Sequence, residues 1–315
     1  MSTGQSLELV VNPAAGGGRA GRVLGEYARA LGAEGFDVTV HRTGGKRQLG
    51  ETIRSLVERG APRVGVMGGD GTFHDAMNAL HVADGSVLPT GDTVFAVIPA
   101  GTGSDLAARG LGVPGEPAAL ARWLAGASPR AFDLGRLEYL DRGGARASML
   151  FTNIASCGIS GRVDELVADG PRWLSGKASY LVATGRAIAG WRHRPMRVRV
   201  DGEVIYEGKA MAFAVCNGRS FGGGMLMAPH ADSTDGVFEV VGLGDMGLGD
   251  VLQHLPKVYR GTHLDVPKVI HGRGRVVEIE STHDDVPLDI DGEPPGTLPA
   301  TFTALPGAVR VLRAP

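Results

Sequence analysis

The sequence contains few cysteines, few aromatic residues and almost no surplus of charge. Of 315 residues, only Cys157 and Cys216 are cysteines, and apolar neighbours surround both. We therefore expect two buried thiols rather than a disulfide or a metal site. The net charge of −2 lacks the clustered basic surplus of nucleic-acid-binding proteins, so we predict no nucleic-acid partner.

The chain also lacks a long apolar run. No stretch reaches the roughly 20 apolar residues that a membrane-spanning helix needs. Met1 to Gln5 is short and polar, and a strand is expected from Leu7, so we expect no signal peptide. These features predict a cytoplasmic protein, with any membrane contact being peripheral, at the inner face of the membrane.

Glycine, in contrast, is abundant, with 50 residues, and the apolar content of 43% is ordinary for a globular protein. The length suggests two domains. We place a nucleotide-binding α/β domain at 1–133 and a second domain at 134–299, with a tail of about 300–315 that returns to the first.

The most informative stretch is Gly68-Gly69-Asp70-Gly71-Thr72. A buried strand is expected at 63–67 before it, and apolar residues at helical spacing follow from Phe73. A helix start after a glycine turn attracts phosphate, and an aspartate is compatible with phosphate when Mg²⁺ lies between them. The alternative is an ordinary glycine turn in which Asp70 caps the helix.

Two similar turns occur in the first half of the chain. The expected strand 7–11 runs into Asn12-Pro13-Ala14-Ala15-Gly16, and the expected strand 94–98 runs into the turn 99–105. A strand at 36–41 and a helix at 47–58 lie between the first two glycine turns. Alternating strands and helices indicate a parallel sheet between helices, with all three turns at the carboxyl ends of its strands.

The second half predicts a mostly antiparallel β domain. Strands are expected at 149–154, 196–200, 209–216, 236–243, 275–280, 286–290 and 309–312. Helices are expected at 162–168, 175–194 and 248–259. The segment from Arg172-Trp173-Leu174 to Trp191-Arg192-His193-Arg194 suits either a membrane interface or a helix packed on the core.

Two stretches of this half carry carboxylates. On an extended chain, Asp289, Asp291 and Glu293 point to one side, which suits a general base near a metal–phosphate complex. The alternative is a hairpin tip, since Asp-Gly is a common turn pair. Asp235 with surrounding carbonyl groups suits a hard cation, or else belongs to a simple turn into the next strand.

Together these motifs resemble the catalytic family of diacylglycerol kinases, which includes sphingosine, ceramide and bacterial lipid kinases. The resemblance covers nearly the whole chain. The matching segments, in order, are Asn12-Pro13 with Gly16-Gly17-Gly18, Gly68 to Thr72, Pro99 to Asp105, Asn217 to Gly236, and Asp291-Gly292-Glu293. Ser104 departs from the family's usual asparagine, and His74 and Asp75 stand where a polar residue and a glutamate are common.

The resemblance implies an NAD kinase-like α/β domain and a C-terminal β-sandwich, with the active site in the cleft between them. It also implies ATP and Mg²⁺ as cofactors. The residues expected to bind ATP are Asn12, Pro13, Ala14, Ala15, Gly16, Thr43, Gly69, Asp70, Gly71, Thr72, Asp75 and Thr102.

The same resemblance implies roles for several carboxylates. Glu293 would accept the proton of the substrate hydroxyl, with Asp291 as its rival. Asp70 would position a catalytic Mg²⁺. A structural Mg²⁺ would be held by Asp235 and by main-chain oxygens near Asp232 and Val237.

The predicted function is ATP-dependent phosphorylation of a lipid hydroxyl, with diacylglycerol or a related lipid as acceptor. The first alternative is a kinase of NAD or of a soluble alcohol. The second is a nucleotide-binding homologue without catalysis. The sequence is also compatible with a homodimer.

Overall fold

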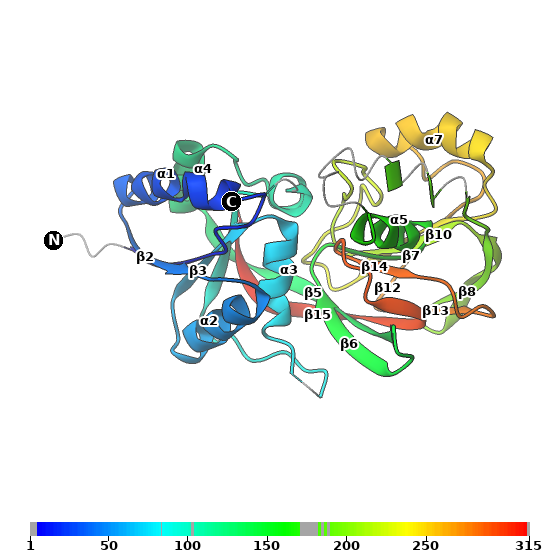
Figure 1. The fold of residues 1–315 in the computed structure, drawn as a ribbon, viewed down its shortest axis with the longest axis horizontal. Coiled ribbons are helices and arrows are strands. Elements are labelled where there is room, and N and C mark those ends of the chain that lie inside the picture. The colour runs from blue at the N-terminus through cyan, green and yellow to red at the C-terminus, as the bar shows by residue number, and fades with distance from the viewer. Residues whose placement is uncertain are drawn as a thin grey trace. The chain divides into compact units, whose positions relative to one another are not determined.

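The computed structural model describes residues 5–82, 84–101, 104–170, 182–183, 186–187 and 190–313 (Figure 1). The chain divides into two compact units, one formed by Met1–Leu134 with Pro306–Pro315 and the other by Gly135–Leu305. Two strands, β5 (Ser128–Asp141) and β15 (Gly296–Arg313), contribute residues to both units. Among the described residues, no helix combines the length and the apolar character that spanning a membrane requires.

The first unit contains a parallel sheet in the strand order β2-β1-β3-β4-β15. Its strands are β1 (Gln5–Val11), β2 (Phe36–Arg42), β3 (Arg63–Gly68), β4 (Val94–Pro99) and the end of β15. Every residue of β4 is buried, as expected for a strand covered on both faces. The predicted parallel sheet is confirmed.

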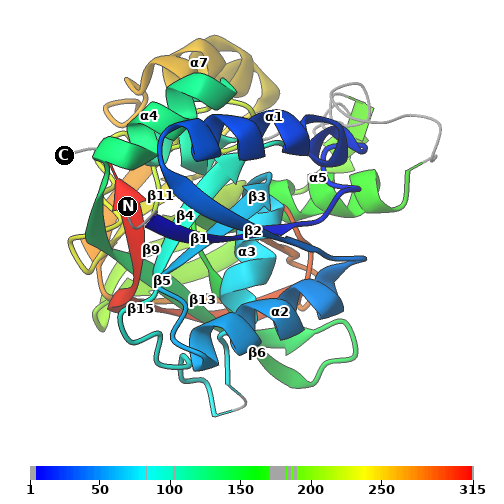
Figure 2. The ribbon, with the colours of Figure 1, turned by 90° about the vertical axis from the view of Figure 1, so that its left-hand side faces the viewer.

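Helices cover both faces of this sheet. They are α1 (Arg19–Ala33), α2 (Lys46–Glu58), α3 (Asp70–Asn78), α4 (Pro117–Gly126) and a short π-helix, η1 (Asp105–Gly110). Helices α1 and α4 lie together on one face, and α2 and α3 lie on the other (Figure 2). The apolar stripe of α1, which includes Leu24, Tyr27 and Leu31, is buried against the sheet, which is why this segment is helical.

The second unit is a β-sandwich, as predicted. One sheet has the order β12-β11-β10-β7-β14, and the other contains β9, β8, β13 and the first part of β15, with β5 and β6. The additional strands are β6 (Arg146–Phe151), β7 (Ile154–Gly158), β8 (Arg194–Val200), β9 (Glu203–Ala210), β10 (Ala212–Cys216), β11 (Phe238–Leu243), β12 (Val269–Gly274), β13 (Val276–Ser281) and β14 (Leu288–Ile290). Its described helices include α5 (Ile159–Ala168) and α7 (Leu248–Arg260).

One apolar core joins the two sheets of the sandwich. The ring of Phe151 stacks on Phe238 with a centroid distance of 5.3 Å and meets Phe302 edge-on at 6.2 Å. Cys157 lies in the same core, and burial raises the pKa of its thiol to about 12. Cys216 is also a free buried thiol, so the prediction of two buried thiols is confirmed.

Several predicted element boundaries were wrong. The strand expected at 149–154 is interrupted at Thr152-Asn153, because these residues donate hydrogen bonds to Asp291 instead of continuing a strand. The strand expected at 209–216 is two strands, broken at Met211. The strand expected at 309–312 is the end of β15. The helix expected at 175–194 lies largely outside the described residues, and Arg194 begins β8 instead.

Sequence reasoning also missed α4, β5 and β12, together with most of β7 and β9. The start of α4 had a local signal, because Pro117 occupies its first turn and the Glu116 carboxylate accepts hydrogen bonds from the N–H groups of Ala118 and Ala119.

Candidate active site

Three glycine turns meet at the carboxyl edge of the parallel sheet. A Cβ atom added to Gly101 would lie 2.5 Å from the Cα atom of Gly69, and one added to Gly16 would lie 2.9 Å from the carbonyl oxygen of Ala100. The amides of Ala100 and Gly101 donate to the carbonyl oxygen of Gly68 at 2.8 and 3.1 Å. The turns expected to converge therefore do so within the first unit, and side chains at Gly16 and Gly101 are excluded by backbone contact.

The first of these turns is held by side chains as well. The Asn12 Oδ1 atom accepts a hydrogen bond from Ala14 N at 3.0 Å, which fixes the backbone of Pro13, Ala14 and Ala15. Arg19 donates from Nη1 to the carbonyl oxygen of Gly101 at 3.1 Å. Arg19 therefore connects the first and third turns and carries a positive charge beside them.

Asp70 connects the second turn to the third. It is the first residue of α3, and its Oδ2 atom accepts a hydrogen bond from Asp105 N at 2.8 Å. Gly69, not Asp70, occupies the cap position of α3, and no side chain caps this helix. Gly71 and Thr72 follow in the first turn of α3, so the expected arrangement of strand, glycine turn and helix is present.

Other predicted ATP-binding residues surround these turns. Thr43 is buried after β2, and both its N and Oγ1 atoms donate to the carbonyl oxygen of Val11, at 2.9 and 3.2 Å. Asp75 forms an ion pair with Lys46 of α2 at 3.0 Å, so this carboxylate carries its own counter-charge. Thr102 lies outside the described residues.

Sequence reasoning missed Lys46 and Asp133. Lys46 begins α2 immediately after Gly44-Gly45, a signal that resembles the other glycine turns. Asp133 is 2% exposed, and its Oδ1 atom accepts a hydrogen bond from Gly307 N at 2.7 Å. Asp133 thereby holds residues 306–315 within the first unit.

The carboxylates at 289–293 do not form an extended row. Asp291 has a φ of 51° and Gly292 a φ of 91°, and Ile290 and Glu293 exchange backbone hydrogen bonds of 2.9 and 3.0 Å. Two consecutive left-handed residues form a tight hairpin turn. The predicted common side of Asp289, Asp291 and Glu293 is therefore wrong, and the alternative of a hairpin tip matches the geometry.

Asp291 holds the neighbouring loop. Its Oδ2 atom accepts from Thr152 N at 2.7 Å and Thr152 Oγ1 at 2.9 Å, and its Oδ1 atom accepts from Asn153 N at 3.1 Å and Ile154 N at 3.0 Å. Asn217 holds the same loop from its other side, because its Nδ2 atom donates to the carbonyl oxygen of Thr152 at 2.8 Å. Two of the sequence motifs thus converge on residues 152–154.

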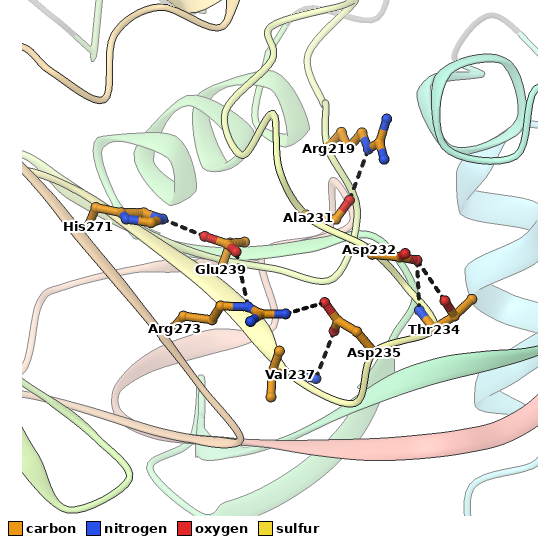
Figure 3. A network of polar contacts seen from close by, with 9 residues as sticks. All are labelled: Arg219, Ala231, Asp232, Thr234, Asp235, Val237, Glu239, His271 and Arg273. Carbon is orange, nitrogen blue, oxygen red and sulfur yellow. Dashed lines mark hydrogen bonds and ion pairs between the residues drawn. The ribbon is translucent and has the colours of Figure 1, made fainter.

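The residues predicted to hold a structural metal form a network of their own (Figure 3). Asp232 Oδ1 accepts from the N and Oγ1 atoms of Thr234 at 3.1 and 2.8 Å. Asp235 Oδ1 accepts from Val237 N at 3.1 Å, and its Oδ2 atom pairs with Arg273 Nη2 at 2.6 Å. Each of these carboxylate oxygens has a donor, and the permanent positive charge of Arg273 beside Asp235 disfavours a second cation there.

The described ranges also lack a ready-made metal cluster. Within them, no cluster of three or more His, Cys, Asp or Glu side chains could hold a metal ion. Asp70 is a single carboxylate beside the glycine turns, which fits a Mg²⁺ whose remaining ligands come from phosphates and water.

The second unit also contains a cavity of about 420 Å³. Its lining includes four arginines, Arg162, Arg186, Arg192 and Arg194, together with Trp191. Arg162 pairs with Glu165 at 2.9 Å, and Arg194 pairs with Asp285, with 2.9 Å between Nε and Oδ1. The guanidinium of Arg194 also lies 6.0 Å from the centre of the Trp191 ring, a cation–π contact.

Comparison with known proteins accounts for both units. Residues 6–137 match the family model of the diacylglycerol kinase catalytic domain. Residues 153–313 match the model described as the YegS C-terminal NAD kinase beta sandwich-like domain.

Individual proteins show the same relationship. A diacylglycerol kinase of Mycobacterium tuberculosis is 31% identical over 99% of both chains. The crystal structure of a putative diacylglycerol kinase from Bacillus anthracis shares the fold with a TM-score of 0.71, at 23% identity over 100% of this chain and 99% of that one. Yeast NADH kinase complexed with NADH has a TM-score of 0.52 at 11% identity, over 99% of this chain and 84% of that one. The two family models, the full-length relative and the glycine turns together show that this chain belongs to the diacylglycerol kinase family of phosphotransferases.

Proposed function

We propose that this protein transfers the γ-phosphoryl group of ATP to the hydroxyl of diacylglycerol or a closely related lipid. The observation that carries the proposal is the closure of three glycine turns on one another beside Asp70. Such turns leave backbone N–H groups directed toward a ligand and exclude the side chains that would block a phosphate chain. The membership of the chain in the diacylglycerol kinase family supports the choice of a lipid acceptor.

The first unit supplies the ATP site in this proposal. The turn 12–16, Thr43, the segment 69–75 and Thr102 bind the nucleotide, and the N-terminus of α3 attracts the phosphates. Asp70 holds a Mg²⁺ ion that neutralises charge on the phosphates. Phosphoryl transfer depends mainly on such positioning and neutralisation, so these residues contribute most of the catalysis.

The second unit supplies the base. Glu293 accepts the proton of the substrate hydroxyl, because both oxygens of its rival Asp291 already accept hydrogen bonds from the loop 152–154. A positioned base of this kind contributes roughly 10²–10⁴-fold to the rate. Asp291 then acts as a positioning residue, because its hydrogen bonds to the loop 152–154 fix the hairpin turn that carries Glu293.

The arginine-lined cavity of the second unit supports peripheral membrane contact. Arg186 and Arg192 are exposed at its rim, and the half-buried Trp191 supplies an apolar ring beside them. Exposed arginines next to tryptophan favour the interface of a membrane that carries anionic lipids. We expect the protein to co-sediment with vesicles that contain phosphatidylglycerol and to remain in solution with vesicles of phosphatidylcholine alone.

Phosphate transfer from radiolabelled ATP to a panel of acceptors tests the proposed function. The panel contains diacylglycerol, ceramide, sphingosine, glycerol and NAD, each with and without Mg²⁺. We expect labelled product with a lipid acceptor and Mg²⁺. Transfer only to NAD or glycerol would identify a kinase of soluble substrates, and ATP binding without any transfer would identify a non-catalytic homologue. Either result would overturn the proposal.

A further inference from the structure

We propose that the exposed guanidinium of Arg273 neutralises Asp235 in the turn 232–237, in the place where relatives were expected to use a structural Mg²⁺. This inference concerns the second unit alone and does not depend on the proposed transfer reaction. Its consequence is that the β-sandwich forms this turn without a bound metal.

The strand pairing places Arg273 between two carboxylates. In the antiparallel pair β11–β12, Glu239 lies directly opposite Arg273, and His271 lies two residues away on the same side of β12. Asp235 precedes β11 by three residues, in the turn that leads into the strand. Arg273 is therefore within reach of one carboxylate from the turn and one from the strand.

The contacts follow from this placement (Figure 3). Arg273 Nη2 lies 2.6 Å from Asp235 Oδ2, and Arg273 Nε lies 3.3 Å from Glu239 Oε1. His271 Nε2 contacts the second oxygen of Glu239. A planar guanidinium can serve two acceptors at once, which a lysine ammonium cannot do with the same fixed geometry.

The charges explain why a cation is needed here. Glu239 is only 6% exposed, and a buried carboxylate without a counter-charge is strongly unfavourable. Hydrogen bonding to Asp235 raises the pKa of Arg273, which is the direction expected when the charged form is held by a carboxylate. Since arginine stays protonated at all ordinary pH values, the neutralisation is permanent.

A divalent metal would require a different arrangement. Mg²⁺ demands six oxygens at about 2.0–2.1 Å in near-octahedral geometry. Asp235 presents one oxygen to the Val237 N–H group and the other to Arg273, and Asp232 presents Oδ1 to Thr234. Mg²⁺ at Asp235 would compete with the guanidinium for this carboxylate and would lie beside a second positive charge, so we expect weak Mg²⁺ binding while Arg273 is in place.

Thermal unfolding of the full chain, without nucleotide, tests this inference. The midpoint is measured in EDTA and in MgCl₂ for the wild type, Asp235→Asn, Arg273→Met and the double variant. The decisive quantity is the rise of the midpoint on adding MgCl₂ minus the same rise in the matching protein that carries Asp235→Asn. This subtraction cancels the effect of Mg²⁺ bound elsewhere in the protein.

In the wild type we expect no part of the Mg²⁺ effect to depend on Asp235. Arg273→Met should lower the midpoint in EDTA and create an Asp235-dependent rise of about 2–4 °C in MgCl₂, because two carboxylates are then left without their cation. Arg199→Met is the matched control, since Arg199 pairs with Glu280 in the other sheet, and it should create no such rise.

Two results would overturn the inference. One is an Asp235-dependent Mg²⁺ rise in the wild type, which would show that metal rather than Arg273 occupies the site. The other is Arg273→Met with an unchanged midpoint in EDTA and no Mg²⁺ response. If Arg273→Met fails to fold, Arg273→Lys replaces it in the same set of measurements, with a smaller drop and a smaller Mg²⁺ rise expected.

Discussion

Gly101 and Gly69 touch through their backbones: a Cβ atom on Gly101 would lie 2.5 Å from the Cα atom of Gly69. The contact joins the turn after β4 to the turn after β3, so the two turns keep one relative position. The residues of both turns that we propose to bind phosphate would depend on this contact.

The first prediction is that Gly101→Ala weakens ATP binding by at least about tenfold. The added methyl group must push the two turns apart, and overpacking of this kind typically costs about 1–3 kcal/mol. Isothermal titration with a non-hydrolysable ATP analogue measures the effect. Gly32→Ala in α1 is the matched control, because its Cβ atom meets nothing within 4 Å. Equal affinities for the two variants would contradict the close contact.

The second prediction is that Asp70→Ala lowers kcat by at least about 100-fold while the protein remains folded. Loss of one charge-positioning group at a reacting centre commonly costs about 10²–10³-fold. Steady-state transfer assays across a range of Mg²⁺ concentrations measure this effect. Asp92→Ala removes an exposed carboxylate that pairs with Arg310, and it should retain wild-type turnover. Near-wild-type activity of Asp70→Ala would refute its assigned role.

The third prediction separates Glu293 from Asp291. Glu293→Gln should lower kcat by about 10²–10⁴-fold, with little change in the unfolding midpoint, because a proton acceptor is lost and the shape is kept. Asp291→Asn should instead destabilise the protein by about 1–3 kcal/mol, because an amide NH₂ group then faces the N–H groups of loop 152–154.

Urea unfolding and transfer assays on both variants check this separation. Asp284→Asn, at an exposed position, serves as the stability control. If Asp291→Asn kept full stability and lost only turnover, Asp291 rather than Glu293 would be the base.

The fourth prediction concerns pH. His263 is 1% exposed, and burial lowers the pKa of its imidazole, while its Nε2 atom bonds to the carbonyl oxygen of Met227 at 3.0 Å. The unfolded chain then binds more protons than the folded chain, so the free energy of unfolding falls as the pH drops below about 6.5. His263→Gln should flatten this dependence.

Urea unfolding at pH 5.5 and pH 7.5 measures the difference. His230→Gln changes an exposed histidine and should leave the pH dependence of the wild type in place. If the free energy of unfolding depended on pH equally steeply in His263→Gln and in the wild type, groups other than His263 would cause the dependence.

The secondary structure of the first unit could be predicted from the sequence because it depends on patterns of neighbouring residues. Each strand, glycine turn and helix follow one another directly in the chain, and the apolar residues of β3 and α3 change period at Gly68-Gly69. The parallel order then follows from the alternation of strands and helices. The same reasoning could have found α4 from Glu116-Pro117.

The second unit was harder because its decisive contacts are distant in sequence. The hairpin at Asp291 is fixed by hydrogen bonds to Thr152, 139 residues earlier, and nothing near Asp291 shows that its oxygens are already used. The pairing of Arg273 with Asp235 spans 38 residues and depends on the register of β11 with β12. An extended chain was therefore assumed where the structure has a tight turn.

The last strand has a consequence for the order in which the chain can fold. Arg310 and Val311 of β15 lie beside Val94 and Phe95 of β4, and Gly307 bonds to Asp133. During synthesis, β4 leaves the ribosome about 200 residues before its neighbour and keeps an open edge of unpaired amide and carbonyl groups until then. The first unit is therefore synthesised first but gains its last strand only at the end of synthesis. A fragment of residues 1–134 would expose the unpaired edge of β4, which favours aggregation.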